Sequence, residues 1–137
     1  MLESKNLHIL IAEDDADDAF IIKDSFEQHP DFNNVVVVSN GQKLLDYLDN
    51  NQLPDMILTD INMPVMDGIE ALKTIFSTNK FHKIPCFVYS TSINPSHKDE
   101  CEKLGVKGFI VKPYSLEEFE TIPQQLIDTM AEAESFS

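Results

Sequence analysis

Asp60 is the residue best placed for nucleophilic chemistry. It follows the apolar run Met56–Thr59 and precedes a loop that contains Pro64 and Gly68. A short apolar run of this kind is typical of a buried strand, and open α/β sheets place their chemistry beyond the carboxyl ends of their strands. A carboxylate at that position can attack an electrophilic centre such as phosphorus. The sequence therefore predicts that Asp60 is a nucleophile.

Two further acids, Glu13 and Asp14, follow the apolar run Leu7–Ala12. Because the carboxyl ends of neighbouring parallel strands lie on one edge of a sheet, we expect both to share a cleft with Asp60. Two carboxylates ~4 Å apart repel by about 4 kcal/mol at an effective dielectric near 20, so the cluster needs a cation. Oxygen ligands favour Mg²⁺, which keeps water positions that phosphate oxygens can take. The backbone carbonyl of Asn62 is a further predicted ligand.

Ser90 and Lys112 stand at the ends of two later apolar runs, 84–90 and 108–111. A hydroxyl and an ammonium are the groups needed to hold the oxygens of a phosphoryl group in transfer. Lys112 precedes Pro113, and a cis peptide bond between them is one way to turn the lysine into the cleft.

The elements that position these residues follow from the alternation of short apolar runs with longer amphipathic stretches. Predicted strands cover residues 7–12, 34–39, 56–59, 84–90 and 108–111. Strands separated by helices predict βαβ units and a parallel sheet with helices on both faces. Helix boundaries are predicted at the N-caps Asp15, Asp67, Asn94 and Ser115 and at Gly105 after a helix end. Pro123 lies about two turns into the last helix and predicts a kink or break near Ile122.

Length and charge limit the function classes. The 137 residues fit one domain, with a core over about residues 6–130 and a short acidic tail. A net charge of −14, with ten lysines and no arginine, disfavours nucleic acid and anionic membranes as direct partners. No apolar run reaches the roughly 18 residues of a membrane span, and Cys86 and Cys101 lack the spacing of a zinc site. We expect a cytoplasmic protein with buried or half-buried thiols.

Other polar residues have simpler interpretations. Asp17 and Asp18 are predicted to be solvated acids that complement the dipole of the first helix. The four histidines, His8, His29, His82 and His97, are predicted to lie on the surface. An aromatic residue in a strand, such as Phe109, is usually part of a core.

Taken in chain order, these residues resemble the receiver domains of two-component response regulators, the CheY-like group. The segments that carry the resemblance are Ile9–Asp14, Pro54–Asp60, Met63–Gly68, Ser90 and Lys112–Pro113. The resemblance covers nearly the whole chain and implies a flavodoxin-like (βα)₅ fold with sheet order 2-1-3-4-5. The segment 91–94 is also similar to stand-alone receivers paired with bacterial phytochromes.

The resemblance assigns a role to each site residue. Asp60 would accept a phosphoryl group from a sensor histidine kinase or a histidine phosphotransfer protein. Glu13, Asp14, Asp60 and the Asn62 carbonyl would hold Mg²⁺, and Lys112 would neutralise the phosphoryl oxygens. The protein would then be no enzyme beyond assisting its own phosphotransfer and dephosphorylation.

Ser90 and Phe109 would form the switch pair. A phosphate oxygen would recruit the Ser90 hydroxyl and vacate space for the ring, which alters the surface over about residues 94–130. We expect no output domain after Lys112, so a downstream protein target or a homodimer would read that surface. The chain could also pass its phosphoryl group on or drain a kinase.

Two other functions remain open at this point. A receiver-fold module could bind its partners without phosphorylation, although the intact acidic set and lysine argue against it. A phosphatase of the haloacid dehalogenase group would also use an aspartate nucleophile. That chemistry needs a second aspartate two residues later as general acid, and Asn62 stands there instead.

Overall fold

The structure is a computed structural model that describes residues 5–91 and 94–135. Its centre is a parallel sheet of five strands in the order β2-β1-β3-β4-β5. The strands are β1 (Leu7–Ala12), β2 (Phe32–Val38), β3 (Met56–Thr59), β4 (Cys86–Ser90) and β5 (Gly108–Val111). The predicted fold class and strand order are confirmed.

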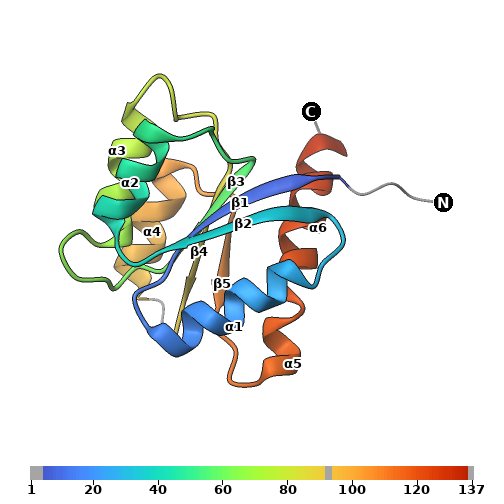
Figure 1. The fold of residues 1–137 in the computed structure, drawn as a ribbon. Helices are drawn as coiled ribbons and strands as arrows, with labels where there is room; N and C mark the ends of the chain where they lie inside the picture. The colour runs from blue at the N-terminus through green and yellow to red at the C-terminus, as the bar shows by residue number, and fades with distance from the viewer. Residues whose placement is uncertain (1–4, 92–93, 136–137) are drawn as a thin grey trace.

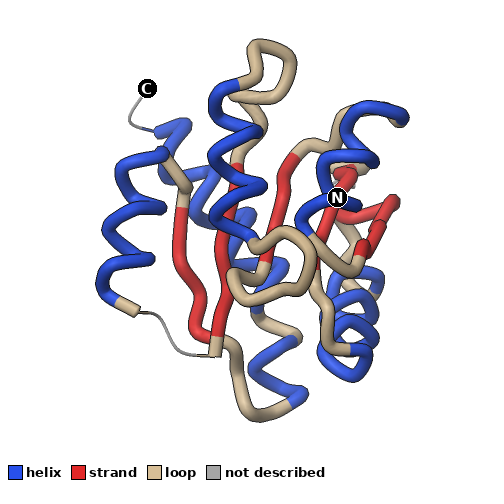
Figure 2. Tube along the Cα trace, turned by 90° about the vertical axis from the view of Figure 1, so that its left-hand side faces the viewer, coloured by secondary structure: helices blue, strands red, loops and turns tan. Residues whose placement is uncertain are grey.

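Helices cover both faces of the sheet (Figure 1). They are α1 (Ala16–Glu27), α2 (Gly41–Asn50), α3 (Gly68–Ser77), α4 (Pro95–Leu104), α5 (Leu116–Phe119) and α6 (Ile122–Ser135). Helices α2, α3 and α4 pack on one face, and α1, α5 and α6 pack on the other. Figure 2 shows the strands side by side between these two layers. In the part of the chain that is described, no helix has the length and apolarity needed to cross a membrane.

Local signals fix most helix boundaries as predicted. Side-chain oxygens of Asp15, Asp67, Asn94 and Ser115 accept backbone N–H bonds at the starts of α1, α3, α4 and α5. Helix α4 ends at Leu104 and is capped by Gly105, whose φ of 105° is a left-handed conformation that glycine adopts without steric cost. The predicted break before Pro123 is also confirmed, because α5 ends at Phe119 and α6 begins at Ile122. Pro123 thus stands in the first turn of a new helix, where a missing N–H costs little.

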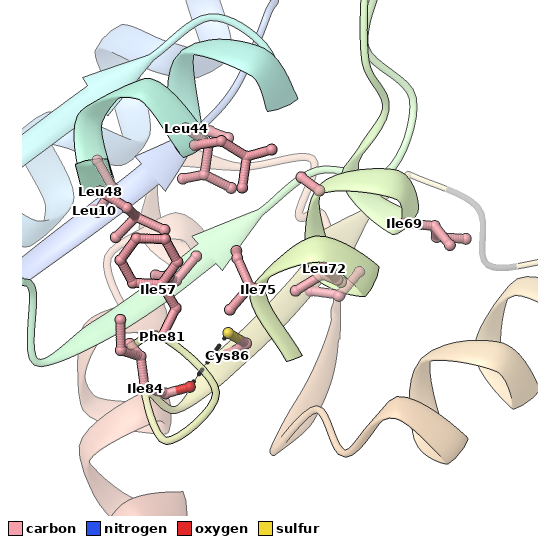
Figure 3. Packing of buried hydrophobic residues seen from close by; sticks show 14 of the residues in the cluster. Leu10, Leu44, Leu48, Ile57, Ile69, Leu72, Ile75, Phe81, Ile84 and Cys86 are labelled. Carbon is pink, nitrogen blue, oxygen red and sulfur yellow. Dashed lines mark hydrogen bonds between the residues drawn. The ribbon is translucent and has the colours of Figure 1, made fainter. Parts of the chain in front are cut away.

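Each face of the sheet carries its own apolar core. The core under α2, α3 and α4 includes Leu10, Leu44, Ile57 and Leu72, and Figure 3 shows these side chains between the sheet and helices α2 and α3. The second core joins β1, β3 and β4 to the other three helices. Both cores bury the central strands on two sides, which explains their unbroken apolar runs.

The two cysteines are buried free thiols, as predicted. Burial raises the pKa of Cys86 to about 12. Burial also raises the pKa of Cys101, to about 11, with a smaller contribution from the nearby charges of Glu100 and Asp67. The Cys86 thiol donates to the Ile84 carbonyl at 3.3 Å (Figure 3).

Three predictions need correction. Strand β2 runs from Phe32 to Val38 instead of 34–39, because Phe32 pairs with Leu7 across an irregularity in the register. Strand β4 begins at Cys86 instead of Ile84, since Pro85 has no N–H to donate.

The third correction concerns the histidines. Only His82 is exposed; His29 and His97 are half-buried, and His8 is buried in β1. The hydroxyl of Tyr47 lies 3.2 Å from His8 Nε2. Burial lowers the pKa of His8, and the charge of Asp55 opposes that shift. His8 stands on β1, which lies between β2 and β3 in the sheet, so its burial follows from the position of its strand.

Candidate functional site

The predicted acidic residues converge at the carboxyl ends of β1 and β3. The backbone N–H of Asp60 donates to the carbonyl of Ala12 at 3.0 Å, which places the two strand ends side by side. Glu13, Asp14 and Asp60 each offer an oxygen, and these atoms all lie within 4.8 Å of one another. Glu13 and Asp60 are buried, whereas Asp14 is exposed. This arrangement of a few carboxylates, one of them open to solvent, is suited to a hard divalent cation.

Both carboxylate oxygens of Asp60 accept hydrogen bonds. Oδ1 accepts the Ile61 N–H at 2.7 Å, and Oδ2 accepts Lys112 Nζ at 2.8 Å. The loop beyond Asp60 folds back tightly, because the Gly68 N–H donates to the Ile61 carbonyl at 2.8 Å. A Cβ at Gly68 would overlap the Asp60 carbonyl oxygen, so this close approach requires glycine.

Lys112 reaches the carboxylates from β5, at the edge of the sheet. Its backbone N–H donates to the Ser90 carbonyl at 2.8 Å, and the peptide bond to Pro113 is trans. Its Nζ lies 2.6 Å from Glu13 Oε1 and 2.8 Å from Asp60 Oδ2. Burial lowers the pKa of Lys112, but hydrogen bonds to Asp60 and Glu13 outweigh that effect and raise the pKa overall. The ammonium therefore stays charged at neutral pH.

Glu13 is held by further donors. The Tyr89 hydroxyl donates to Oε1 at 2.6 Å, and the Asp15 N–H donates to Oε2 at 3.2 Å. Burial raises the pKa of Glu13 in spite of the hydrogen bonds from Lys112 and Tyr89, which favour the carboxylate. The ring of Tyr89 also lies under Lys112, with Nζ 4.9 Å from the ring centroid. Tyr89 thus contacts both charges of the buried ion pair.

The remaining predicted residues lie around this centre. Asn62 is exposed in the loop after β3. Ser90 is buried at the end of β4. Phe109 is half-buried and pairs with Val88 across β4 and β5. Because Val88 and Ser90 are two residues apart on one strand, Ser90 and Phe109 face the same side of the sheet.

Two residues of the site were not predicted. Asp18 was expected to be a solvated acid in the first turn of the first helix; it does lie in the first turn of α1, but its side chain is only 30% exposed and its Oδ2 lies 3.2 Å from Lys112 Nζ, so the expectation of a merely solvated acid is wrong. The helical spacing could have indicated this position. Asp18, Ile22 and Phe26 are four residues apart and share one face of the helix, and the last two are fully buried. Tyr89 gave no comparable signal, since an aromatic residue in a strand is usually part of a core.

Comparisons with known proteins agree with this geometry. Residues 9–123 match the response regulator receiver domain family. The structure of the phosphorylated cyanobacterial phytochrome response regulator RcpA superposes with a TM-score of 0.81 at 31% identity, covering 88% of this chain and 91% of that one. The bacteriophytochrome response regulator AtBRR superposes with a TM-score of 0.74 at 27% identity, covering 91% and 92%.

Curated relatives include longer proteins. A protein-glutamate methylesterase/protein-glutamine glutaminase of Methanosarcina mazei is 32% identical over 89% of this chain. The match spans only 34% of that relative, so the chain corresponds to about a third of its length. The chemotaxis protein CheY1 of Helicobacter pylori is 28% identical over 80% of this chain and 87% of its own. The match of the receiver domain family to most of the sequence, together with the superposed folds, means that this chain belongs to the response regulator receiver domain family.

Proposed function

We propose that this chain is a phosphoryl acceptor in two-component signalling and that Asp60 is the acceptor residue. The observation that carries the proposal is the pairing of a buried aspartate with a buried lysine, 2.8 Å from Asp60 Oδ2 to Lys112 Nζ, beside two further carboxylates. The similarity to RcpA, whose structure is of a phosphorylated protein, supports the same role.

In the proposed reaction an Asp60 carboxylate oxygen attacks the phosphorus of a phosphohistidine. The new bond joins that oxygen to phosphorus, the bond from phosphorus to the histidine nitrogen breaks, and the nitrogen keeps the electron pair. Lys112 stays protonated and stabilises negative charge on the phosphoryl oxygens in transfer. The Ile61 N–H on Oδ1 fixes the orientation of the carboxylate before the reaction, which reduces the entropy cost of reaching the transition state.

Mg²⁺ is the cofactor that the donor set fits best. Glu13, Asp14, Asp60 and the backbone carbonyl of Asn62 are the proposed ligands, and the exposed carboxylate of Asp14 leaves one side open to water. When bound, the ion neutralises charge on the phosphoryl oxygens. The carboxylates would hold the ion, and Lys112 balances the charge of the two buried ones through its ion pairs with Glu13 and Asp60.

The proposed donor is a sensor histidine kinase or a histidine phosphotransfer protein in the cytoplasm. Ser90 and Phe109 are the proposed switch pair, because both face the same side of the sheet on the neighbouring strands β4 and β5. A shift of the Phe109 ring would alter the surface of α4, β5 and α5, which a downstream protein or a second copy of the chain would read.

Intact mass spectrometry after incubation with acetyl phosphate tests this function. The wild type should gain one phosphoryl group in the presence of Mg²⁺, and Asp60→Asn should gain none. The matched control is Asp49→Asn, which changes an exposed aspartate of α2 by the same substitution and should behave like the wild type.

Omitting Mg²⁺ should reduce the wild-type adduct strongly. An equal adduct on wild type and Asp60→Asn would contradict the proposal. A folded wild type that forms no adduct from acetyl phosphate or from a phosphohistidine donor would favour a module that binds partners without phosphorylation.

A further inference from the structure

The ammonium of Lys112 is saturated with acceptors. Lysine has three N–H donors and no acceptor. Among the residues described, three carboxylates lie within ion-pair distance of Nζ: Glu13 at 2.6 Å, Asp60 at 2.8 Å and Asp18 at 3.2 Å. Each donor therefore already has a carboxylate partner. A phosphoryl oxygen that arrives at Asp60 can gain a Lys112 donor only if one of these three carboxylates gives it up.

Two of these three carboxylates, Glu13 and Asp60, are poorly suited to release the Lys112 ammonium. The Glu13 side chain is fully buried and is also held by the Tyr89 hydroxyl and the Asp15 N–H. Asp60 is itself the proposed acceptor, and the Ile61 N–H holds its other oxygen. Displacing Glu13 would leave a carboxylate without its strongest donor inside the protein, which is costly.

Asp18 differs from both in distance and exposure. Its contact with Nζ is the longest of the three, and 30% of its side chain is exposed, against 0% for Glu13 and 8% for Asp60. Asp18 and Lys112 both line a surface hollow of about 320 Å³ beside Tyr114, so the carboxylate has solvent next to it. Released from Lys112, it can be hydrated at once.

We propose that Asp18 is a positioning residue that occupies the Lys112 donor which a phosphoryl oxygen takes over. This inference rests on the proposed function and adds a residue to it. In the unphosphorylated protein Asp18 shares Lys112 with Glu13 and Asp60. When the phosphoryl group is bound, Asp18 loses this donor and its negative charge opposes the new one. Asp18 therefore weakens phosphoryl binding and favours the unphosphorylated state.

Binding of beryllofluoride, a phosphoryl mimic that is not transferred, isolates this effect from the rates of chemistry. Fluorine NMR in saturating Mg²⁺ would measure its affinity for the wild type, Asp18→Asn and Asp17→Asn. Asp17 is an exposed acid in the same first turn of α1, so its variant changes the net charge and the helix dipole by the same amount. Asp18→Ala provides a second variant if the asparagine does not fold, with thermal unfolding as the check.

We expect Asp18→Asn to bind beryllofluoride about threefold more tightly than Asp17→Asn, the size of effect typical of a partly exposed ion pair. Equal affinities in the two variants would overturn the inference while leaving the proposed function intact. Weaker binding by Asp18→Asn would also overturn it, because Asp18 would then be assisting the phosphoryl group. Absence of binding by the folded wild type would overturn both.

Discussion

The two halves of the site carry opposite charges and have different surroundings. The carboxylates follow strands β1 and β3, and the lysine follows strand β5. The residues of β3, and those of β1 after Leu7, are buried. The residues of β5 are half-buried at best, and Val111, next to Lys112, is 59% exposed. The carboxylates thus extend from a packed core, whereas the lysine comes from an edge strand and is held by its own ion pairs. Packing positions the carboxylates, and ion pairs position the lysine.

Removing the lysine's charge should have the largest effect. Lys112→Met keeps most of the side-chain volume but leaves Glu13 and Asp60 as buried carboxylates without their cation. We expect the free energy of unfolding to fall by about 4 kcal/mol in urea titrations without Mg²⁺. Adding Mg²⁺ should recover part of the loss. Lys107→Met, at an exposed position, is the control and should change little. A loss below about 1 kcal/mol for Lys112→Met would mean that charge does not hold this half of the site.

Truncating a central strand should have the next largest effect. Leu58→Ala removes a fully buried side chain from β3 and should cost about 3 kcal/mol in the same titrations. Val111→Ala shortens an exposed side chain on β5 and should stay within about 0.5 kcal/mol of the wild type. Similar losses in the two variants would remove the distinction between packed centre and exposed edge.

The Tyr89 hydroxyl links the two halves, because it donates to Glu13 while its ring lies under Lys112. Tyr89→Phe removes the hydroxyl and keeps the ring. The expected loss is about 1.5 kcal/mol, as for a hydrogen bond to a charged group. Tyr114→Phe removes a hydroxyl from a residue that is 92% exposed and should not change thermal or urea stability. If the two variants unfolded alike, Glu13 would not depend on Tyr89.

The smallest expected effect concerns the loop after β3. Val65 has a φ of 68° and is 82% exposed, so a β-branched side chain is strained there without compensating burial. Val65→Asn should raise the free energy of unfolding by about 0.5–1 kcal/mol, because asparagine tolerates this conformation better. The same substitution at Val111, which has extended backbone, should not stabilise. A destabilised Val65→Asn would show that the valine makes a contact that matters more than its strain.

Much of the fold was predictable because its signals are local. The apolar runs of β1 and β3, the N-caps Asp67 and Asn94, and Pro123 each determine structure within a few residues. The exact start of β4 was not predicted, because it depends on the register with β3, which begins at Cys86, as well as on the missing N–H of Pro85. The burial of His8 depends on its element and on the later residue Tyr47.

The site was predictable in part for the same reason. The positions of Glu13, Asp14, Asp60 and Lys112 at strand ends predicted that they lie close together, and the structure shows them close together. Asp18 and Tyr89 were missed because their roles depend on contacts with Lys112, and those contacts follow from how α1 and β4 pack beside the end of β5. The helical spacing of α1 places Asp18 on the same face as the buried residues Ile22 and Phe26. Its charge alone does not distinguish it from its neighbour Asp17.

The measurement that tests the central claim most directly is the location of the phosphoryl group. Borohydride reduces an aspartyl phosphate to homoserine, and peptide mass spectrometry then identifies the reduced residue. After incubation with a phosphodonor and Mg²⁺, homoserine should appear at position 60. Homoserine at position 14 or 18, or a phosphoryl group that stays on a histidine, would contradict the assignment of Asp60 as the acceptor.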